Sequence, residues 1–209
     1  MDYTPKEKET PGYKRVHFFK YFLTETDWND RHQYHLAKLR LHTSQLHGMG
    51  IQDGLTTFRV LQSSPPSLKV EITPGIGTDV QGREILVWGN ESMTVDLEKF
   101  QLPATVYLKV VYQEIATDRC RMGDGRIENR YFRESYRFII NDRPADDNQL
   151  ELARIALTPD CTEIKDAADP LNPGPNEIDM RFRRNCASMR GLDMEARHNL
   201  LRLLRERKS

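Results

Sequence analysis

The chain has 209 residues, of which 30% are charged and 38% hydrophobic, and its 31 basic side chains balance its 31 acidic ones. This length predicts one large domain or two small ones with a real core, and the neutral total argues against a general nucleic-acid binder. No apolar run reaches the length of a membrane span, and the Lys- and Glu-rich start lacks the apolar core of a signal peptide. We therefore expect a cytoplasmic protein with no membrane span. Its three cysteines, Cys120, Cys161 and Cys186, are too widely spaced for a disulfide framework and are expected to be reduced thiols.

A long helix is predicted over residues 25–47. Thr24 is a capping residue with an acid, Asp27, three positions on, which is the pattern of a capping box. Gly48 and Gly50 follow, and glycine supplies the left-handed conformation that ends many helices. A helix with these bounds is about 35 Å long.

One face of this helix carries six residues at steps of 4, 3, 4, 3 and 4, and three of them are histidine. This heptad spacing predicts a seam that packs on the chain itself or on another subunit. Imidazoles gain charge around pH 6, so such a seam is expected to loosen in acid. The alternatives are plain solvent exposure and a zinc site shared by His32 and His35, although the His-Glu-x-x-His motif is missing. The six residues, called the helix seam below, are Trp28, His32, His35, Leu39, His42 and Leu46.

From residue 51 onward the pattern changes to short apolar runs separated by turns that contain proline or glycine, which indicates strands. Three longer runs near the middle of the chain are expected to form one antiparallel sheet, and the first two of them alternate as strands with one wet face do. Gly75, Gly77 and Gly82 predict hairpin turns, because the Lys and Ser or Thr of a nucleotide-binding loop do not follow them. The expected strands are residues 54–61, 68–73, 84–88, 92–95, 105–116, 130–141 and 150–157.

The last third of the chain is polarised in charge. Residues 141–180 hold ten acidic and three basic side chains, whereas residues 181–209 hold nine basic and three acidic ones. We expect the two stretches to neutralise each other, within the chain or across a subunit contact, in preference to binding nucleic acid or a membrane surface. A basic final helix capped by Asp193 is predicted, with Leu200, Leu201 and Leu204 among its apolar residues.

These patterns together predict a mainly β fold, an antiparallel sandwich or barrel, with one long N-terminal helix and a C-terminal helix. Three parts are expected. Residues 1–50 form an extended arm and the helix, residues 51–166 form the β-rich domain, and residues 167–209 form a proline-rich linker and the basic helix.

Four groups of short motifs, taken together, are more specific than any one of them. They are Phe18-Phe19 with Leu23-Thr24 and Asp27-Trp28-Asn29, Tyr34-His35 with Leu39, Leu46-His47-Gly48-x-Gly50 with Gly54-Leu55, and Pro74-Gly75 with Asp79-x-x-Gly82-Arg83-Glu84-Ile85. The set resembles structural proteins of phage-tail-like contractile injection systems, of the baseplate or tail-fibre attachment kind. The resemblance implies a non-enzymatic building block that assembles as an oligomer with other particle proteins and needs no cofactor.

Three functions remain as hypotheses, and we expect the first. It is a structural or adaptor subunit at the baseplate or end of such a particle, with no catalytic residue, cofactor or metal. The second is a β-sandwich module of a tail fibre that binds a carbohydrate or another surface ligand, and the third is a metal-dependent hydrolase. Each nominates its own side chains: the helix seam with Leu200, Leu201 and Leu204 for assembly, Tyr131, Phe132 and Tyr136 for a ligand, and His32 and His35 for a metal.

Overall fold

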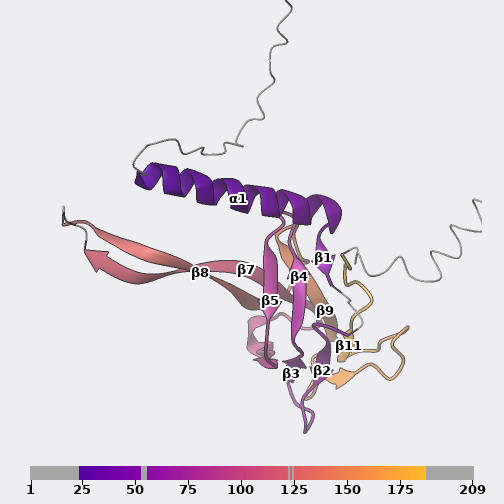
Figure 1. Cartoon of the computed structure of the whole chain (residues 1–209). Helices are drawn as coiled ribbons and strands as arrows, with labels where there is room; N and C mark the ends of the chain where they lie inside the picture. The colour runs from indigo at the N-terminus through magenta and orange to yellow at the C-terminus, as the bar shows by residue number, and fades with distance from the viewer. Residues whose placement is uncertain (1–23, 53–55, 122, 124, 187–209) are drawn as a thin grey trace, which may run out of the picture.

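The computed structural model describes residues 24–52, 56–121, 123 and 125–186. In this part the chain is mainly β, and one long helix, α1 (Glu25–Leu46), lies across one side of a body made of three sheets (Figure 1). No helix of the described part is long and apolar enough to cross a membrane. The predicted final helix with Leu200, Leu201 and Leu204 lies outside the described residues.

The helix α1 begins and ends where the sequence predicts. The Asp27 N–H donates to Thr24 Oγ1 (3.2 Å) and the Thr24 N–H donates to Asp27 Oδ2 (3.0 Å), which completes the capping box. Hydrogen bonds from the Thr24 side chain and backbone hold the pKa of the Asp27 carboxyl below its usual range. At the other end His47 is the C-cap, and Gly48 follows with a φ of 71°.

Three sheets form the body. The first runs in the order β1 (Gly50–Ile51), β4 (Gly75–Thr78), β5 (Glu84–Val87), and the second in the order β2 (Val60–Gln62), β3 (Lys69–Ile72), β6 (Glu91–Thr94). The third and largest runs β10 (Lys165–Asp166), β11 (Glu177–Asp179), β9 (Gln149–Leu157), β7 (Ala104–Arg121), β8 (Ile127–Asn141). Neighbouring strands are antiparallel except β10 and β11, and a short 3₁₀ helix, η1 (Leu97–Lys99), leads into β7.

The core lies where the three sheets pack against one another. Every sheet contributes side chains that are almost fully buried, and they form one continuous cluster. The fold is mainly β, as the sequence predicts, and the barrel option is wrong for the described strands, because the large sheet ends at β8 and β10. Central members of the cluster are Val60, Val70, Ile72, Ile85, Val87, Leu108, Val110, Leu152 and Ile155.

The glycines near residue 75 correct one prediction. Gly75 and Gly77 lie in strand β4 and not in turns, while Gly82 does lie in the turn between β4 and β5, with a φ of 75°. A Cβ at Gly75 would lie 2.5 Å from the Phe58 ring, and one at Gly77 less than 3.0 Å from Leu150. Glycine stands in β4 because the strand packs directly on these two side chains.

The first predicted strand, residues 54–61, is also shorter in the structure. Phe58 has a φ of 49° and a fully buried ring, so the chain turns there to place that ring in the core. Strand β2 begins only at Val60.

The proline-rich segment after residue 166 packs against strand β9 of the same chain. The Asn176 N–H donates to the Ala156 carbonyl (2.8 Å), and Asn176 Oδ1 accepts from the Thr158 N–H (2.9 Å). These contacts place β11 beside β9, so the large sheet continues past residue 166.

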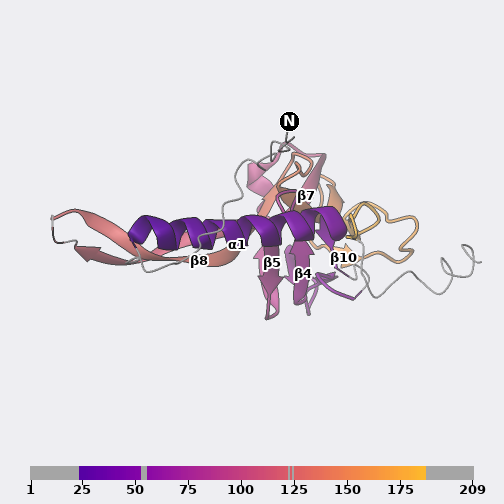
Figure 2. The same ribbon diagram turned by 45° about the horizontal axis from the view of Figure 1, so that its top comes forward.

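Strands β7 and β8 extend beyond their predicted ranges and pair alone at their far ends. Strand β9 follows β7 only as far as the pair Val111–Gln149, whereas β8 pairs with β7 out to Arg121–Ile127. The two-stranded part, residues 112–121 and 127–136, projects from the body and is about 33 Å long (Figures 1 and 2). We call it the arm. In both views the N-terminal half of α1 extends to the same side of the body as the arm.

Candidate assembly surface

The backbone of helix α1 at Arg40 packs directly on Gly82, in the turn between β4 and β5. Gly82, with its positive φ, lies so close to the helix that a Cβ would come within 3.0 Å of the Arg40 carbonyl oxygen. Glycine takes this φ without strain and leaves this space. Thr43, one turn further along the helix, is buried and donates its hydroxyl to the Leu39 carbonyl (3.0 Å). The helix is therefore held close to the body near residues 40–43.

Asp79 organises this turn. Its buried carboxylate accepts the backbone N–H groups of Gln81 (2.9 Å) and Arg83 (3.0 Å), and also accepts from Arg83 Nε (2.6 Å). The Gly82 N–H donates to the Asp79 carbonyl (3.0 Å). A carboxylate is tolerated in a protein interior when it is paired and hydrogen-bonded in this way. The Asp79-x-x-Gly82-Arg83 motif thus builds the support of α1.

Arg83 links the turn to the root of the arm. Its guanidinium lies 4.8 Å from the centre of the Tyr112 ring, within the range of a cation–π contact. The Tyr112 hydroxyl is 2.8 Å from Glu114 Oε1 and 2.9 Å from Glu134 Oε1, so two carboxylates share its single proton. Burial, followed by these two acceptors, raises the pKa of the Tyr112 phenol well above its ordinary value. Because Glu114 and Glu134 are directly opposite across β7 and β8, the shared proton offsets repulsion between like charges.

Arg40 closes this network from the helix. Its Nη2 donates to Glu114 Oε1 at 3.2 Å, and both side chains are partly exposed, so the ion pair alone contributes little stability. Its effect is positional, because it ties the middle of α1 to the root of the arm. Sequence reasoning did not find this cluster, which joins residues far apart in the chain. We call it the helix seat, and it comprises Arg40, Asp79, Gly82, Arg83, Tyr112 and Glu114.

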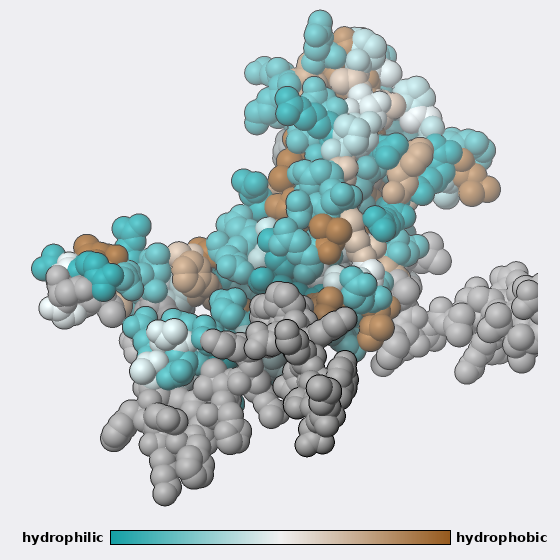
Figure 3. Space-filling model, turned by 90° about the horizontal axis from the view of Figure 1, so that it is seen from above, coloured by the Kyte–Doolittle hydropathy of each residue, from teal (hydrophilic) through white to brown (hydrophobic). Residues whose placement is uncertain are grey.

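The helix seam borders the side of α1 that meets the body, but is itself exposed. All six of its residues are exposed, and the apolar ones strongly so: 55% for Trp28, 56% for Leu39 and 55% for Leu46. The Arg31 guanidinium lies 5.8 Å from the centre of the Trp28 ring, on the same helix. From the side of α1, apolar residues form separate patches on a largely hydrophilic surface (Figure 3). Among the described residues, the seam is not packed against the chain's own body.

The seam histidines do not gather into a metal site. Among their contacts, His35 packs edge-on to Tyr34 (5.4 Å between ring centroids) and His42 to His47 (5.8 Å). Across the described ranges, no group of three or more His, Cys, Asp or Glu side chains is placed to hold a metal ion. His32 and His35 therefore have no third ligand among these residues.

The arm carries exposed apolar side chains on both faces. Ile127 is 63% exposed, Tyr131 55% and Phe132 68%. Tyr131 and Phe132 are consecutive in β8, so they point to opposite faces of the ribbon. Tyr136 is half-buried and about 13 Å further along the strand than Phe132. Its hydroxyl donates to Glu91 Oε1 (2.7 Å), and this bond raises the pKa of Tyr136. The three rings predicted to bind a ligand therefore form no common platform.

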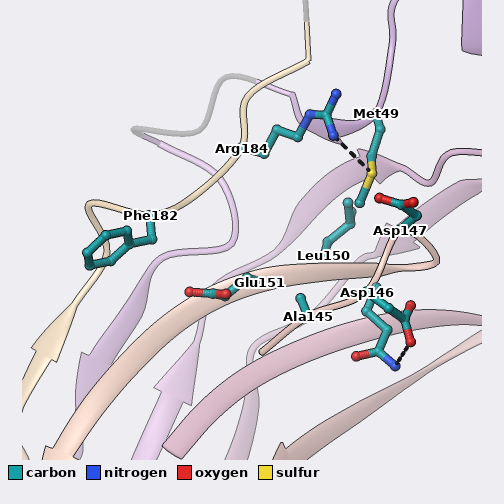
Figure 4. A pocket seen from close by; sticks show the side chains of 9 residues that line it. Met49, Ala145, Asp146, Asp147, Leu150, Glu151, Phe182 and Arg184 are labelled. Atoms are coloured by element: carbon teal, nitrogen blue, oxygen red, sulfur yellow. Dashed lines mark hydrogen bonds between the residues drawn. The ribbon is translucent and has the colours of Figure 1, made fainter. Parts of the chain in front are cut away.

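A small acidic pocket lies between the loop before β9 and the segment after β11 (Figure 4). Its volume is about 170 Å³, below the range of roughly 300–1,000 Å³ usual for small-molecule sites. Two of its carboxylates already serve the fold, because Asp146 Oδ2 accepts from Gln149 Nε2 (2.7 Å) and Glu151 pairs with Arg154. The pocket is lined by Met49, Ala145, Asp146, Asp147, Gln149, Leu150, Glu151, Phe182 and Arg184.

Comparisons with known proteins give distant structural similarities. No protein-family model matches the chain, and no curated protein matches it. The chain is similar to a solved structure titled "Crystal structure of TssK", with a TM-score of 0.42 and 11% identity over 69% of this chain and 38% of that one. It is also similar to a chain of "The baseplate complex from the type VI secretion system", with a TM-score of 0.44 and 10% identity over 75% of this chain and 41% of that one. The chain thus spans about two fifths of the length of these two proteins.

Proposed function

We propose that this chain is a non-enzymatic structural or adaptor subunit of a contractile, phage-tail-like injection particle. It assembles in the cytoplasm and contacts neighbouring subunits at the baseplate or particle end. The observation that carries the proposal is the orientation of α1, whose heptad seam is exposed while the adjacent side of the helix rests on the helix seat.

The outward seam runs against the usual pattern of a surface helix, which turns its apolar stripe to the core of its own domain. Burial of one large apolar side chain is worth about 1.5–3 kcal/mol. Trp28, Leu39 and Leu46 are each a little over half exposed in the described part of the chain, so about half of that free energy is not realised there. A neighbouring subunit that covers the seam would recover it.

The arm gives independent support. A lone two-stranded ribbon is at best marginally stable in water, because it has no second layer to cover either face. The arm has apolar side chains exposed on both faces, at Ile127, Tyr131 and Phe132. A neighbour that packs on the arm would supply the missing layer. The kind of particle in the proposal comes from the sequence resemblance, and the contact surfaces come from the geometry.

Self-association and partner binding test the proposal. We expect the purified chain to form a defined oligomer by size exclusion with light scattering, and to co-purify with other particle proteins. The variant Trp28→Ser/Leu39→Ser/Leu46→Ser should remain folded and lose both properties. Leu41→Ser is the matched control, since Leu41 is an exposed leucine on the opposite side of α1 and should change neither.

A monomer at high concentration that also fails to co-purify with particle proteins would overturn the proposal. Equal assembly of the seam variant and the Leu41→Ser control would also overturn it. Light scattering at neutral pH and again near pH 5.5 on His35→Leu adds a test of the predicted acid sensitivity, because a leucine at that seam position carries no titrating ring.

A further inference from the structure

Strand β8 gives the arm an edge that no described strand pairs with. It is the last strand of the large sheet, and among the described strands residues 127–136 pair only with β7. Every second N–H and C=O group of such an edge strand points away from its neighbour and can bond to a further strand. We infer that residues 13–22 of the same chain pair with this edge and make the arm a three-stranded sheet.

The sequence of residues 13–22 is typical of a strand. It reads YKRVHFFKYF, and six of its ten residues are Tyr, Val or Phe, which are enriched in strands. The turn-forming pair Pro11-Gly12 precedes it and the helix cap Thr24 follows Leu23, so the run is bounded on both sides. A strand needs a partner for its backbone N–H and C=O groups, and a sheet edge supplies one.

The start of α1 places this segment level with the outer part of the arm. The helix is tied to the root of the arm where Arg40 Nη2 donates to Glu114 Oε1 at 3.2 Å. From Arg40 back to Glu25 the helix covers about 22 Å, and from Glu114 out to Arg121 strand β7 covers about 23 Å. Both lead to the same side of the body in Figures 1 and 2. The chain therefore enters α1 about as far out as the paired end of the arm.

The length and the direction of the segment fit the edge of β8. Ten extended residues span about 33 Å, which is the length of the arm. A segment that ends beside the outer part of the arm and lies along it runs from the root outward. That direction is antiparallel to β8 and parallel to β7. Antiparallel pairs are the commoner kind, and they need no long crossover, so β8 is the edge that the segment takes.

The charges favour a course back beside α1 over one that leads away from it. Residues 13–22 hold three Lys or Arg side chains and no acidic one, whereas residues 25–30 hold three acidic side chains and no basic one. A third strand also steadies the arm, because a lone two-stranded ribbon is marginal in water. Assembly is not needed for this pairing, which occupies an edge and leaves both faces of the arm, with Tyr131 and Phe132, open to a neighbour.

Amide hydrogen exchange on the full chain tests the pairing. The variant Val16→Pro/Phe19→Pro removes two backbone N–H groups that point in opposite directions along a strand, so one of them faces β8 in any register. Lys6→Pro/Glu9→Pro is the matched control, with two prolines at the same spacing upstream of Pro11. Amides of the core strands β3 and β9 show whether the body is folded in each variant.

By NMR, we expect the amides of residues 127–136 that point away from β7 to exchange at least about ten-fold more slowly in the native chain and the control than in Val16→Pro/Phe19→Pro. Exchange as fast as that of exposed amides in the native chain would overturn the inference, and so would equally slow exchange in the two proline variants. Mass spectrometry at a hundredfold lower concentration identifies the occupant. Protection that persists on dilution supports pairing within one chain, whereas protection that fades assigns the strand to a second copy and overturns it.

Discussion

At the scale of single residues, Gly82 decides whether α1 can rest on the body. We expect Gly82→Ala to destabilise the fold by about 2–4 kcal/mol, because alanine must take a left-handed φ and its Cβ meets the Arg40 carbonyl. Gly125→Ala is the matched control, since Gly125 has a φ of 86° and nothing within 4 Å of an added Cβ. Urea unfolding should show the control to be less destabilised by at least about 1 kcal/mol. Equal losses for the two variants would mean that α1 does not press on the turn.

Tyr112 makes the helix seat sensitive to high pH. Its folded pKa lies above its unfolded value of about 10, so its contribution to stability is complete below pH 10 and is lost as the pH rises toward the folded pKa. We expect Tyr112→Phe to cost about 1–3 kcal/mol at pH 8, because the hydrogen bonds to Glu114 and Glu134 disappear. The difference from the native chain should shrink above pH 10. Urea unfolding at both pH values measures it, with Tyr34→Phe as control. A difference that is constant with pH would contradict the role given to the shared proton.

At the scale of elements, local signals were enough for α1 and most strands. The capping box at Thr24 and the glycine at 48 set the two ends of the helix, and alternation marked β7 and β8. Strand β4 was missed because its glycines look like turn residues, and only the packing of Phe58 and Leu150 explains them.

The candidate site also has one part that the sequence predicted, the helix seam, and one part that it did not, the helix seat. Heptad spacing identified the seam because spacing is a local property, but whether the seam faced inward or outward depended on which side of α1 met Gly82. The helix seat joins residue 40 with residues 79–83 and 112–114. No local pattern reports contacts of that separation, so the motif around Asp79 was visible while its mechanical role was not.

The arm exposes apolar side chains that its own fold does not cover. We expect Ile127→Ser/Tyr131→Ser/Phe132→Ser to change the free energy of unfolding by no more than about 0.5 kcal/mol per site, as at other exposed positions. Co-purification with particle proteins should fall, because the apolar contacts on both faces of the arm are removed. Arg133→Ser, an exposed polar residue of the same strand, is the control. Unchanged co-purification of the triple variant would exclude the arm from assembly.

At the scale of the whole molecule, two extended features leave the same side of the body, and each exposes apolar surface. The body itself has a continuous core built from all three sheets. Of the arm, only its root at Tyr112 and Tyr136 contributes to this core. An assembly subunit needs such a division between a packed body and exposed contact elements. If the chain is such a subunit, its thermal stability should rise with the fraction of molecules that are in the oligomer.

Thermal unfolding should report this dependence directly. If the native chain unfolds from an oligomer, mass action stabilises it as concentration rises, and each tenfold increase should raise Tm by about 2 °C. The variant Trp28→Ser/Leu39→Ser/Leu46→Ser should show a Tm independent of concentration, because its seam no longer supports association, whereas Leu41→Ser should follow the native chain. Calorimetry across a hundredfold concentration range separates these outcomes. If the seam variant keeps the native concentration dependence, association runs through another surface, and α1 serves only its own subunit.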